Sequence, residues 1–218
     1  MFNRNRLAAF IACAIAPQAA ATVFMSEYIE GASYDKGIEI YNAGNSDVDL
    51  SSYQIKVFFN GNSTASTSIS LDGTLEAGEF FLYAHSDASF ASAAQLTSGA
   101  SLFNGDDAVV LYNGDTVVDS LGQVGFDPGS EWSVNGVDTQ NRGLRRLAVT
   151  TDTNISDEFD PSEQWQAFDN EDFSDLLAFN GDGGTGDGGN DDEDPGNGES
   201  MFVVVPHQQL VSCKAAAM

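Results

Sequence analysis

Short segments with alternating apolar and polar residues follow one another along the middle of the chain. In the segment YQIKVFF, Ile55 and Val57 alternate with Gln54 and Lys56. This period of two places alternate side chains on opposite faces of a β-strand. No long segment has the 3.6-residue period of an amphipathic helix. The pattern predicts an all-β domain with strands over 23–29, 37–41, 53–60, 66–71, 80–84, 108–112, 116–121 and 144–149.

Two of the connections between these segments have the composition of hairpin turns. Asn113-Gly114 separates VVLY from DTVVDS, and Asn60-Gly61 follows YQIKVFF. Asn and Gly tolerate the positive φ that a type I′ turn requires. Antiparallel hairpins at this spacing favour a two-sheet sandwich, and a closed barrel is the alternative that periodicity alone leaves open.

The N-terminus has the three parts of a secretory signal peptide. Arg4 and Arg6 precede an apolar run over 7–16, and Ala21 completes an A-x-A site. The run is shorter than the roughly twenty residues that span a bilayer, and no later stretch is long and apolar enough to do so. We therefore predict that residues 1–21 are cleaved near Ala21, which makes the mature chain secreted, extracellular or periplasmic, without a membrane span.

The two cysteines leave no disulfide to hold an exported domain together. Cys13 lies in the predicted leader, and Cys213 is the one cysteine beyond it. A lipoprotein signal at Cys13 is the weaker interpretation, because Phe10 stands where a branched aliphatic residue is preferred. The mature domain must depend on an apolar core.

The chain is strongly acidic, with a formal net charge of −25 at pH 7. Because the leader carries two arginines and no acid, cleavage would bring the net charge to −27. Such a charge repels nucleic acid and anionic lipid at long range. We expect no direct nucleic-acid binding driven by charge.

Composition divides the mature chain into three parts. Residues 22–179 have the size of one domain. Residues 180–200 are rich in Gly and Asp, and we expect them to form a disordered, self-repelling acidic linker. Residues 201–218, MFVVVPHQQLVSCKAAAM, form a short tail without Gly or acid.

Four segments together resemble a known domain family. They are MSEYIEGASYDKGIEIYNAG, LEAGEFFLYA, LFNGDDAVVLYNGDTVVDSLGQVG and GLRRLAVTTDTNISDEFDPSEQW. In content and order they resemble the bacterial lamin tail domain, an immunoglobulin-like β-sandwich, and most of all the version at the front of large secreted nucleases of Gram-negative bacteria. The resemblance implies a non-catalytic accessory module. In full-length relatives a linker, an oligonucleotide-binding-like segment and a nuclease domain of the endonuclease/exonuclease/phosphatase type follow it.

The motifs of that nuclease domain are missing from this chain. Those nucleases have a G-D-F-N segment and a closing S-D-H, in which Asp orients a His base. Here His85-Ser86-Asp87 has the letters in another order, so we expect His85 to be a solvated loop side chain. Walker, G-x-S-x-G, H-E-x-x-H and dinucleotide motifs are also absent. We assign no catalytic or cofactor-binding residue; a small secreted DNA phosphodiesterase is the rival hypothesis.

Acidic side chains in or beside loops are candidates for a calcium site, because hard cations take several oxygen ligands. The candidates are Asp106, Asp107, Asp119, Asp157, Glu158 and Asp160. The alternative is that these acids are solvated. A second rival hypothesis follows, in which the chain is a stand-alone cell-envelope or calcium-stabilised adhesion module.

The compact basic cluster of the mature domain is NRGLRR, with Arg142, Arg145 and Arg146. A guanidinium suits a phosphate, but charge-driven DNA binding needs a basic face. We expect these arginines to pair with carboxylates, with the acids of 157–160 as candidate partners.

Trp132 and Trp165 each follow a turn signal by a few residues. An exposed tryptophan could stack on a sugar or a base, whereas a buried one anchors a loop to the core. We expect both to be buried anchors.

The abrupt change after GNGES leads to a genetic prediction. A Gly/Asp-rich linker gives way at Ser200 to a tail too short for a domain, so we hypothesise a frameshift near Ser200 in a nuclease gene. Sequencing past the stop codon should then show, in another frame, a segment with G-D-F-N and S-D-H motifs. If no frame resumes such a sequence, a stand-alone lamin tail protein remains.

Overall fold

The computed structural model describes residues 23–179, and within them the chain forms strands and four short 3-10 helices but no α-helix. The predicted signal peptide, linker and tail lie outside the described residues. No helix in 23–179 is long and apolar enough to cross a membrane. The 3-10 helices are η1 (Leu50–Ser52), η2 (Phe59–Gly61), η3 (Ala91–Ala93) and η4 (Pro161–Glu163).

The strands form a six-stranded sheet, a four-stranded sheet and two short ribbons. In spatial order, the six-stranded sheet contains β14 (Trp165–Asp169), β13 (Arg142–Arg146), β1 (Val23–Glu30), β2 (Lys36–Asn42), β7 (Phe80–His85) and β8 (Leu96–Ser98). The four-stranded sheet contains β10 (Thr116–Leu121), β9 (Ala108–Asn113), β4 (Tyr53–Phe58) and β5 (Thr67–Ser70). The ribbons pair β11 (Ser133–Val134) with β12 (Val137–Asp138), and β3 (Val48–Asp49) with β6 (Thr74–Leu75).

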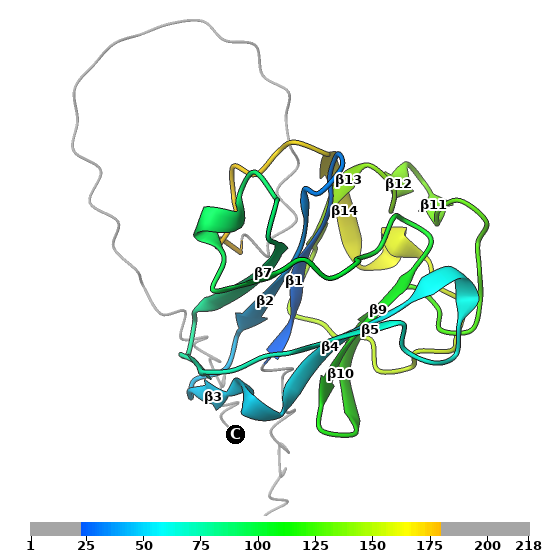
Figure 1. The fold of residues 1–218 in the computed structure, drawn as a ribbon. Coiled ribbons are helices and arrows are strands. Elements are labelled where there is room, and N and C mark those ends of the chain that lie inside the picture. The colour runs from blue at the N-terminus through cyan, green and yellow to red at the C-terminus, as the bar shows by residue number, and fades with distance from the viewer. Residues whose placement is uncertain (1–22, 180–218) are drawn as a thin grey trace, which may run out of the picture. The chain divides into compact units, whose positions relative to one another are not determined.

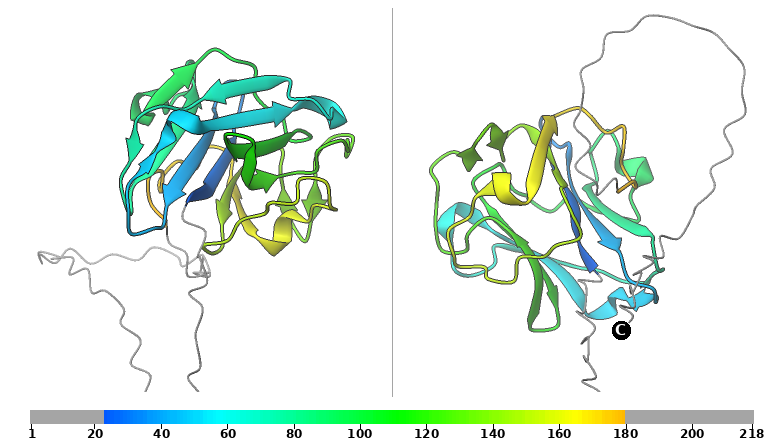
Figure 2. Two further views of the ribbon diagram at one scale, coloured as in Figure 1. Left: turned by 90° about the horizontal axis from the view of Figure 1, so that it is seen from below. Right: turned by 180° about the vertical axis from the view of Figure 1, so that it is seen from behind.

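The two larger sheets pack face to face, as Figures 1 and 2 show. One apolar cluster contains residues of both sheets, among them Ile38 and Ile40 of β2 and Ile55 and Val57 of β4. All strand pairs are antiparallel except β7 with β8. The sheets are open and separate, so the all-β sandwich prediction is confirmed and the closed barrel is wrong.

The predicted strands all exist, with most boundaries displaced by one or two residues. The largest displacement is at the last one, predicted over 144–149 but observed at Arg142–Arg146. Strand β14 and the short strands β3, β6, β8, β11 and β12 were not predicted. Most of these have two or three residues, too few to show a period.

Both predicted hairpins form, but one turn is displaced by a residue. Asn113 pairs with Thr116, so the two-residue loop is Gly114-Asp115 rather than Asn113-Gly114. Gly114 has a φ of 58° in the first loop position, as in a type II′ turn. Asn60 and Gly61 both have positive φ, as predicted, but they belong to η2 in a longer connection, because the last residue pair of the β4–β5 hairpin is Val57 with Thr67.

Strand β1 is interrupted by a bulge, and all of its residues are buried. The register with β2 shifts between Met25 and Glu27, which leaves Ser26 as the extra residue. Because of the bulge, Met25 and Tyr28 both face the core although they are three residues apart. The same shift places Glu27 opposite Glu39 on the outer face of the sheet.

The segment 170–179, here called the C-terminal strap, covers that outer face after β14 ends (Figure 1). Phe173 and Leu176 pack against a small cluster that includes Ile29 and Leu82. Phe179 lies edge-on to the ring of Phe24, at 5.4 Å between centroids. The strap explains why β1 is buried on both faces.

Candidate functional site

A buried ion pair joins the two sheets. Asp119 of β10 and Arg146 of β13 have fully buried side chains, with 2.5 Å between Oδ2 and Nη2. Asp119 also accepts hydrogen bonds from the N–H groups of Met25 and Asp152, each at 2.9 Å. The Arg146 guanidinium lies 3.9 Å from the ring centroid of Trp165. Burial raises the pKa of Asp119, and Arg146 opposes the shift. Asp119 was a candidate metal ligand in or beside a loop, but it lies on β10 and its side chain is buried in the core.

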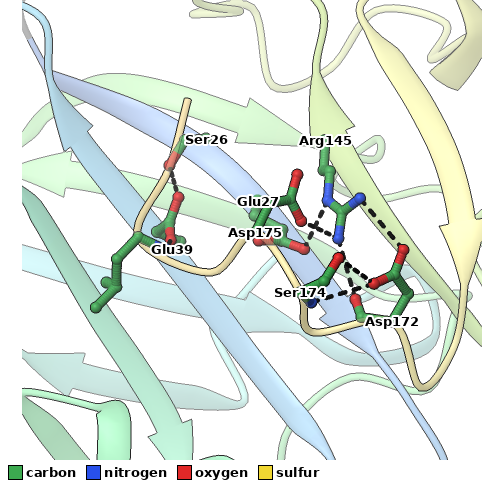
Figure 3. A network of polar contacts seen from close by, with 8 residues as sticks. Ser26, Glu27, Glu39, Arg145, Asp172, Ser174 and Asp175 are labelled. Carbon is green, nitrogen blue, oxygen red and sulfur yellow. Dashed lines mark hydrogen bonds and ion pairs between the residues drawn. The ribbon is translucent and has the colours of Figure 1, made fainter. Parts of the chain in front are cut away.

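A second network surrounds Arg145 on the outer face of the six-stranded sheet (Figure 3). Its Nε donates to Glu27 at 3.2 Å, and its Nη1 lies 3.6 Å from a carboxylate oxygen of Asp172. Asp175 forms a further ion pair with Nη2. The guanidinium lies 3.8 Å from the ring centroid of Phe168. Arg145 therefore ties β1 to the C-terminal strap.

Two buried carboxyl groups lie beneath the strap on adjacent strands. Glu39 accepts hydrogen bonds from the Ser26 hydroxyl at 2.7 Å and from the Leu177 N–H at 2.5 Å. Burial, with a contribution from Glu39, raises the pKa of Glu27 to about 8, and Arg145 opposes the shift. Burial also raises the pKa of Glu39 to about 7, and its hydrogen bonds oppose the shift. Neither glutamate was singled out from the sequence. Strict alternation would place Glu27 on the face of Met25, and the bulge at Ser26 moves it to the outer face.

Arg142 completes the basic cluster and pairs near the surface. Its guanidinium lies 3.8 Å from a carboxylate oxygen of Asp138 and 3.5 Å from one of Asp169. All three arginines therefore face carboxylates, as predicted. The predicted partners over 157–160 are wrong, because strand pairing brings acids distant in sequence to these arginines.

The candidate metal-binding acids occupy different parts of the structure. Asp107 is buried and accepts backbone hydrogen bonds from Asn60 at 2.8 Å and Asn104 at 3.1 Å. Burial raises the pKa of Asp107 to about 6, and these hydrogen bonds oppose the shift. Asp106 is also buried beside it, and burial raises its pKa. Asp107 therefore anchors the loop before β9 to the β4–β5 hairpin.

The later candidates lie in the loop that leads to η4. Asp160 caps that helix by accepting a hydrogen bond from the Ser162 N–H at 2.8 Å. Asp157 and Glu158 are exposed. Within residues 23–179, no three or more His, Cys, Asp or Glu side chains gather as ligands for a metal ion. The structure thus does not assemble the predicted acids into one site, and calcium binding stays a prediction.

His85 is buried rather than solvated, so that expectation is wrong. It ends β7, where its ring stacks on Tyr34 at 4.6 Å between centroids and 15° between planes. Its Nδ1 accepts a hydrogen bond from the Asp87 N–H at 3.1 Å. The Ser/Ala-rich composition of its surroundings concealed this packing.

Both tryptophans are buried, as predicted. Trp132 lies edge-on to Phe159, and its backbone N–H donates to Thr139 Oγ1 at 3.0 Å. Trp165 packs in the main core at the start of β14. Neither offers a free face for stacking on a ligand.

These features define an immunoglobulin-like β-sandwich module whose arginines are committed to internal ion pairs. Residues 16–125 match the family model of the Lamin Tail Domain, which is just over half of the 218 residues. The chain belongs to the lamin tail domain family. A search of curated proteins finds no match. The matched region ends after β10. The strands β13 and β14, which complete the six-stranded sheet, lie beyond it, as does the strap.

The buried pair leads to a prediction about stability. Arg146→Met leaves Asp119 buried without its partner, and breaking such a pair typically costs about 3–5 kcal/mol. We expect a loss of that order in the free energy of unfolding, measured by denaturant titration. Arg142→Met is the matched control on the same strand, where a surface pair contributes about 1 kcal/mol or less.

The double variant Asp119→Leu with Arg146→Met removes both charges and should recover part of the loss, which keeps the test informative if the single variant does not fold. Equal effects of Arg146→Met and Arg142→Met would contradict the assigned role of the pair.

The buried glutamates lead to a prediction about pH. Their folded pKa values, about 8 and about 7, lie above the ordinary value of 4.5, so the folded state binds protons more tightly. This contribution to stability is complete below pH 4.5 and is lost as pH rises through 7 and 8. We expect the melting temperature to fall across this interval, and to fall less in the double variant Glu27→Gln with Glu39→Gln.

Glu76→Gln, which alters an exposed carboxylate after β6, serves as the control and should follow the wild-type curve. Parallel curves for the wild type and the double variant would show that the two glutamates titrate normally.

Proposed function

We propose that this chain is a non-catalytic accessory module of an exported protein and acts in binding or targeting beside an extracellular nuclease. The observation that carries the proposal is a lamin tail domain whose basic cluster is used internally. Export is supported by the signal-peptide pattern of residues 1–21. The nuclease association is supported by the resemblance of the four sequence segments.

The non-catalytic role is supported by the contacts of the polar side chains in 23–179, which are made within the protein. Arg145, Arg146 and Asp119 form ion pairs within the protein. The imidazole of His85 stacks on Tyr34, and its Nδ1 accepts a hydrogen bond from the Asp87 N–H. A catalytic base is in turn oriented by a second group, and the bond at His85 comes from a backbone N–H rather than from a carboxylate.

Recognition of nucleic acid by this module itself is disfavoured by charge. Phosphate contacts require arginines or lysines directed to solvent. Arg145 and Arg146 are directed to carboxylates and aromatic rings, and Arg142 lies between Asp138 and Asp169. In this proposal the module contributes localisation, and any catalysis belongs to a partner domain or protein.

A cleavage assay tests the non-catalytic role. The purified chain is incubated with supercoiled plasmid in Mg²⁺, Mn²⁺ or Ca²⁺, with and without EDTA. We expect no nicking above the buffer control, while a nuclease added to a parallel sample cuts the same plasmid. EDTA-sensitive cleavage that co-elutes with the chain through two chromatographic steps would refute the proposal and favour the phosphodiesterase hypothesis.

A further inference from the structure

A pocket of about 430 Å³ opens at one end of the six-stranded sheet. Three segments meet there: the β1–β2 turn with the start of β2, the end of β7, and the loop after β8. The lining side chains used below are Ser33, Tyr34, Lys36, His85, Asp87 and Ser101. The volume lies within the roughly 300–1,000 Å³ of small-molecule sites.

An exposed aromatic ring stands at this pocket and is held in place. Tyr34 is 55% exposed, the largest fraction among the exposed large hydrophobic side chains of residues 23–179. Large exposed apolar groups at a concave site mark binding surfaces more often than isolated ones elsewhere. The Tyr34 ring is stacked on the buried imidazole of His85, which fixes its orientation.

The turn that carries Tyr34 is also fixed. The Gly31 N–H donates to the Asp35 carbonyl at 2.7 Å, and Asp35 Oδ1 accepts a hydrogen bond from the Ser89 N–H at 2.5 Å. The first bond closes the β1–β2 turn, and the second ties the turn to the segment after β7. A ligand would therefore meet a platform that is already ordered, so little conformational entropy is lost on binding.

The charges at the pocket disfavour an anionic ligand. Lys36 is the ammonium group in the lining, and it forms an ion pair with Glu30. Asp87 adds an exposed carboxylate, so the three groups together carry a net negative charge. A single carboxylate at the lining and a single exposed ring are also too few for a divalent-cation site or an aromatic cage.

The remaining lining groups suit a neutral ligand with many hydroxyl groups. Ser33, Ser101 and Tyr34 carry hydroxyls that both donate and accept hydrogen bonds, and Asp87 accepts them. An aromatic face beside such groups matches a sugar ring, which has an apolar face and a polar edge.

We propose that this pocket binds a neutral carbohydrate of one or two sugar rings. Tyr34 is the stacking platform, and Asp87, Ser33 and Ser101 bind the hydroxyl groups. The proposal does not depend on the nuclease association, since a carbohydrate ligand would also serve a stand-alone envelope module.

Binding of the full chain to an array of neutral glycans, including glucans, mannans and chitin oligosaccharides, identifies the probe. Titration calorimetry with the strongest of these oligosaccharides then measures affinity. We expect Tyr34→Ala and Asp87→Ala each to weaken binding by about tenfold or more, because each removes a direct contact. Tyr34→Phe keeps the stacking ring and removes one hydroxyl group, so it should weaken binding much less than Tyr34→Ala does.

Phe126→Ala is the matched control, because Phe126 is also exposed but does not line the pocket. Melting curves check that each variant is folded, and Asp87→Asn replaces Asp87→Ala if that variant is not. Absence of binding to every neutral glycan overturns the proposal, as does binding that both substitutions leave unchanged. Binding restricted to sulfated glycans, or competition by inorganic phosphate, overturns the assignment of a neutral ligand. None of these outcomes bears on the plasmid assay, so the two proposals fail separately.

Discussion

The fold depends on one buried ion pair. Asp119 and Arg146 come from different sheets, and the carboxylate and the guanidinium also bind the N–H and C=O of Met25 beside the bulge in β1. Charges taken out of water must be paired and hydrogen-bonded, or they cost several kcal/mol each. The two sheets can satisfy this requirement only in one relative register. A slip of one residue in β10 or β13 would point either side chain to the opposite face. The pair therefore contributes specificity to a sandwich whose apolar residues alone would tolerate several alignments.

On the outer face of the six-stranded sheet, the buried charges are mainly acidic and are covered by the C-terminal strap. There Glu27 and Glu39 face each other across β1 and β2, and the C-terminal strap shields both from water. Arg145 balances part of the negative charge of the glutamates, and it also pairs with two aspartates of the strap, which add negative charge of their own. Phe173 and Leu176 of the strap pack on the apolar side chains of the sheet and stabilise its position there. The strap thus contacts the sheet through apolar side chains and through groups next to titratable glutamates. The stability of its packing on the sheet is therefore linked to the protonation of the two glutamates.

The central strands could be predicted from the sequence because their apolar alternation is local and regular. Ile55 and Val57 face the core as the pattern indicates, and Asn60-Gly61 adopts the positive φ that its composition favours. Non-local features could not be predicted in the same way. The bulge at Ser26 changes the face of every residue that precedes it in β1, and nothing in the local pattern marks it. The arginines were correctly expected to pair, but their partners are brought to them by strand order rather than by proximity in the sequence. The stacking of Tyr34 on His85 likewise joins a turn to the end of a distant strand.

The place of β1 in the sheet has a consequence for how the chain folds. This first strand lies between β2 and β13, and the contact between Glu27 and Arg145 spans 118 residues. Such a pairing closes a long loop, and high contact order slows folding. Until β13 emerges from the ribosome, one side of β1 presents unpaired N–H and C=O groups, the kind of edge that recruits other chains. A chain shortened to the end of the family match at residue 125 would keep that edge open permanently. The minimal folding unit is therefore longer than the segment by which the family is recognised.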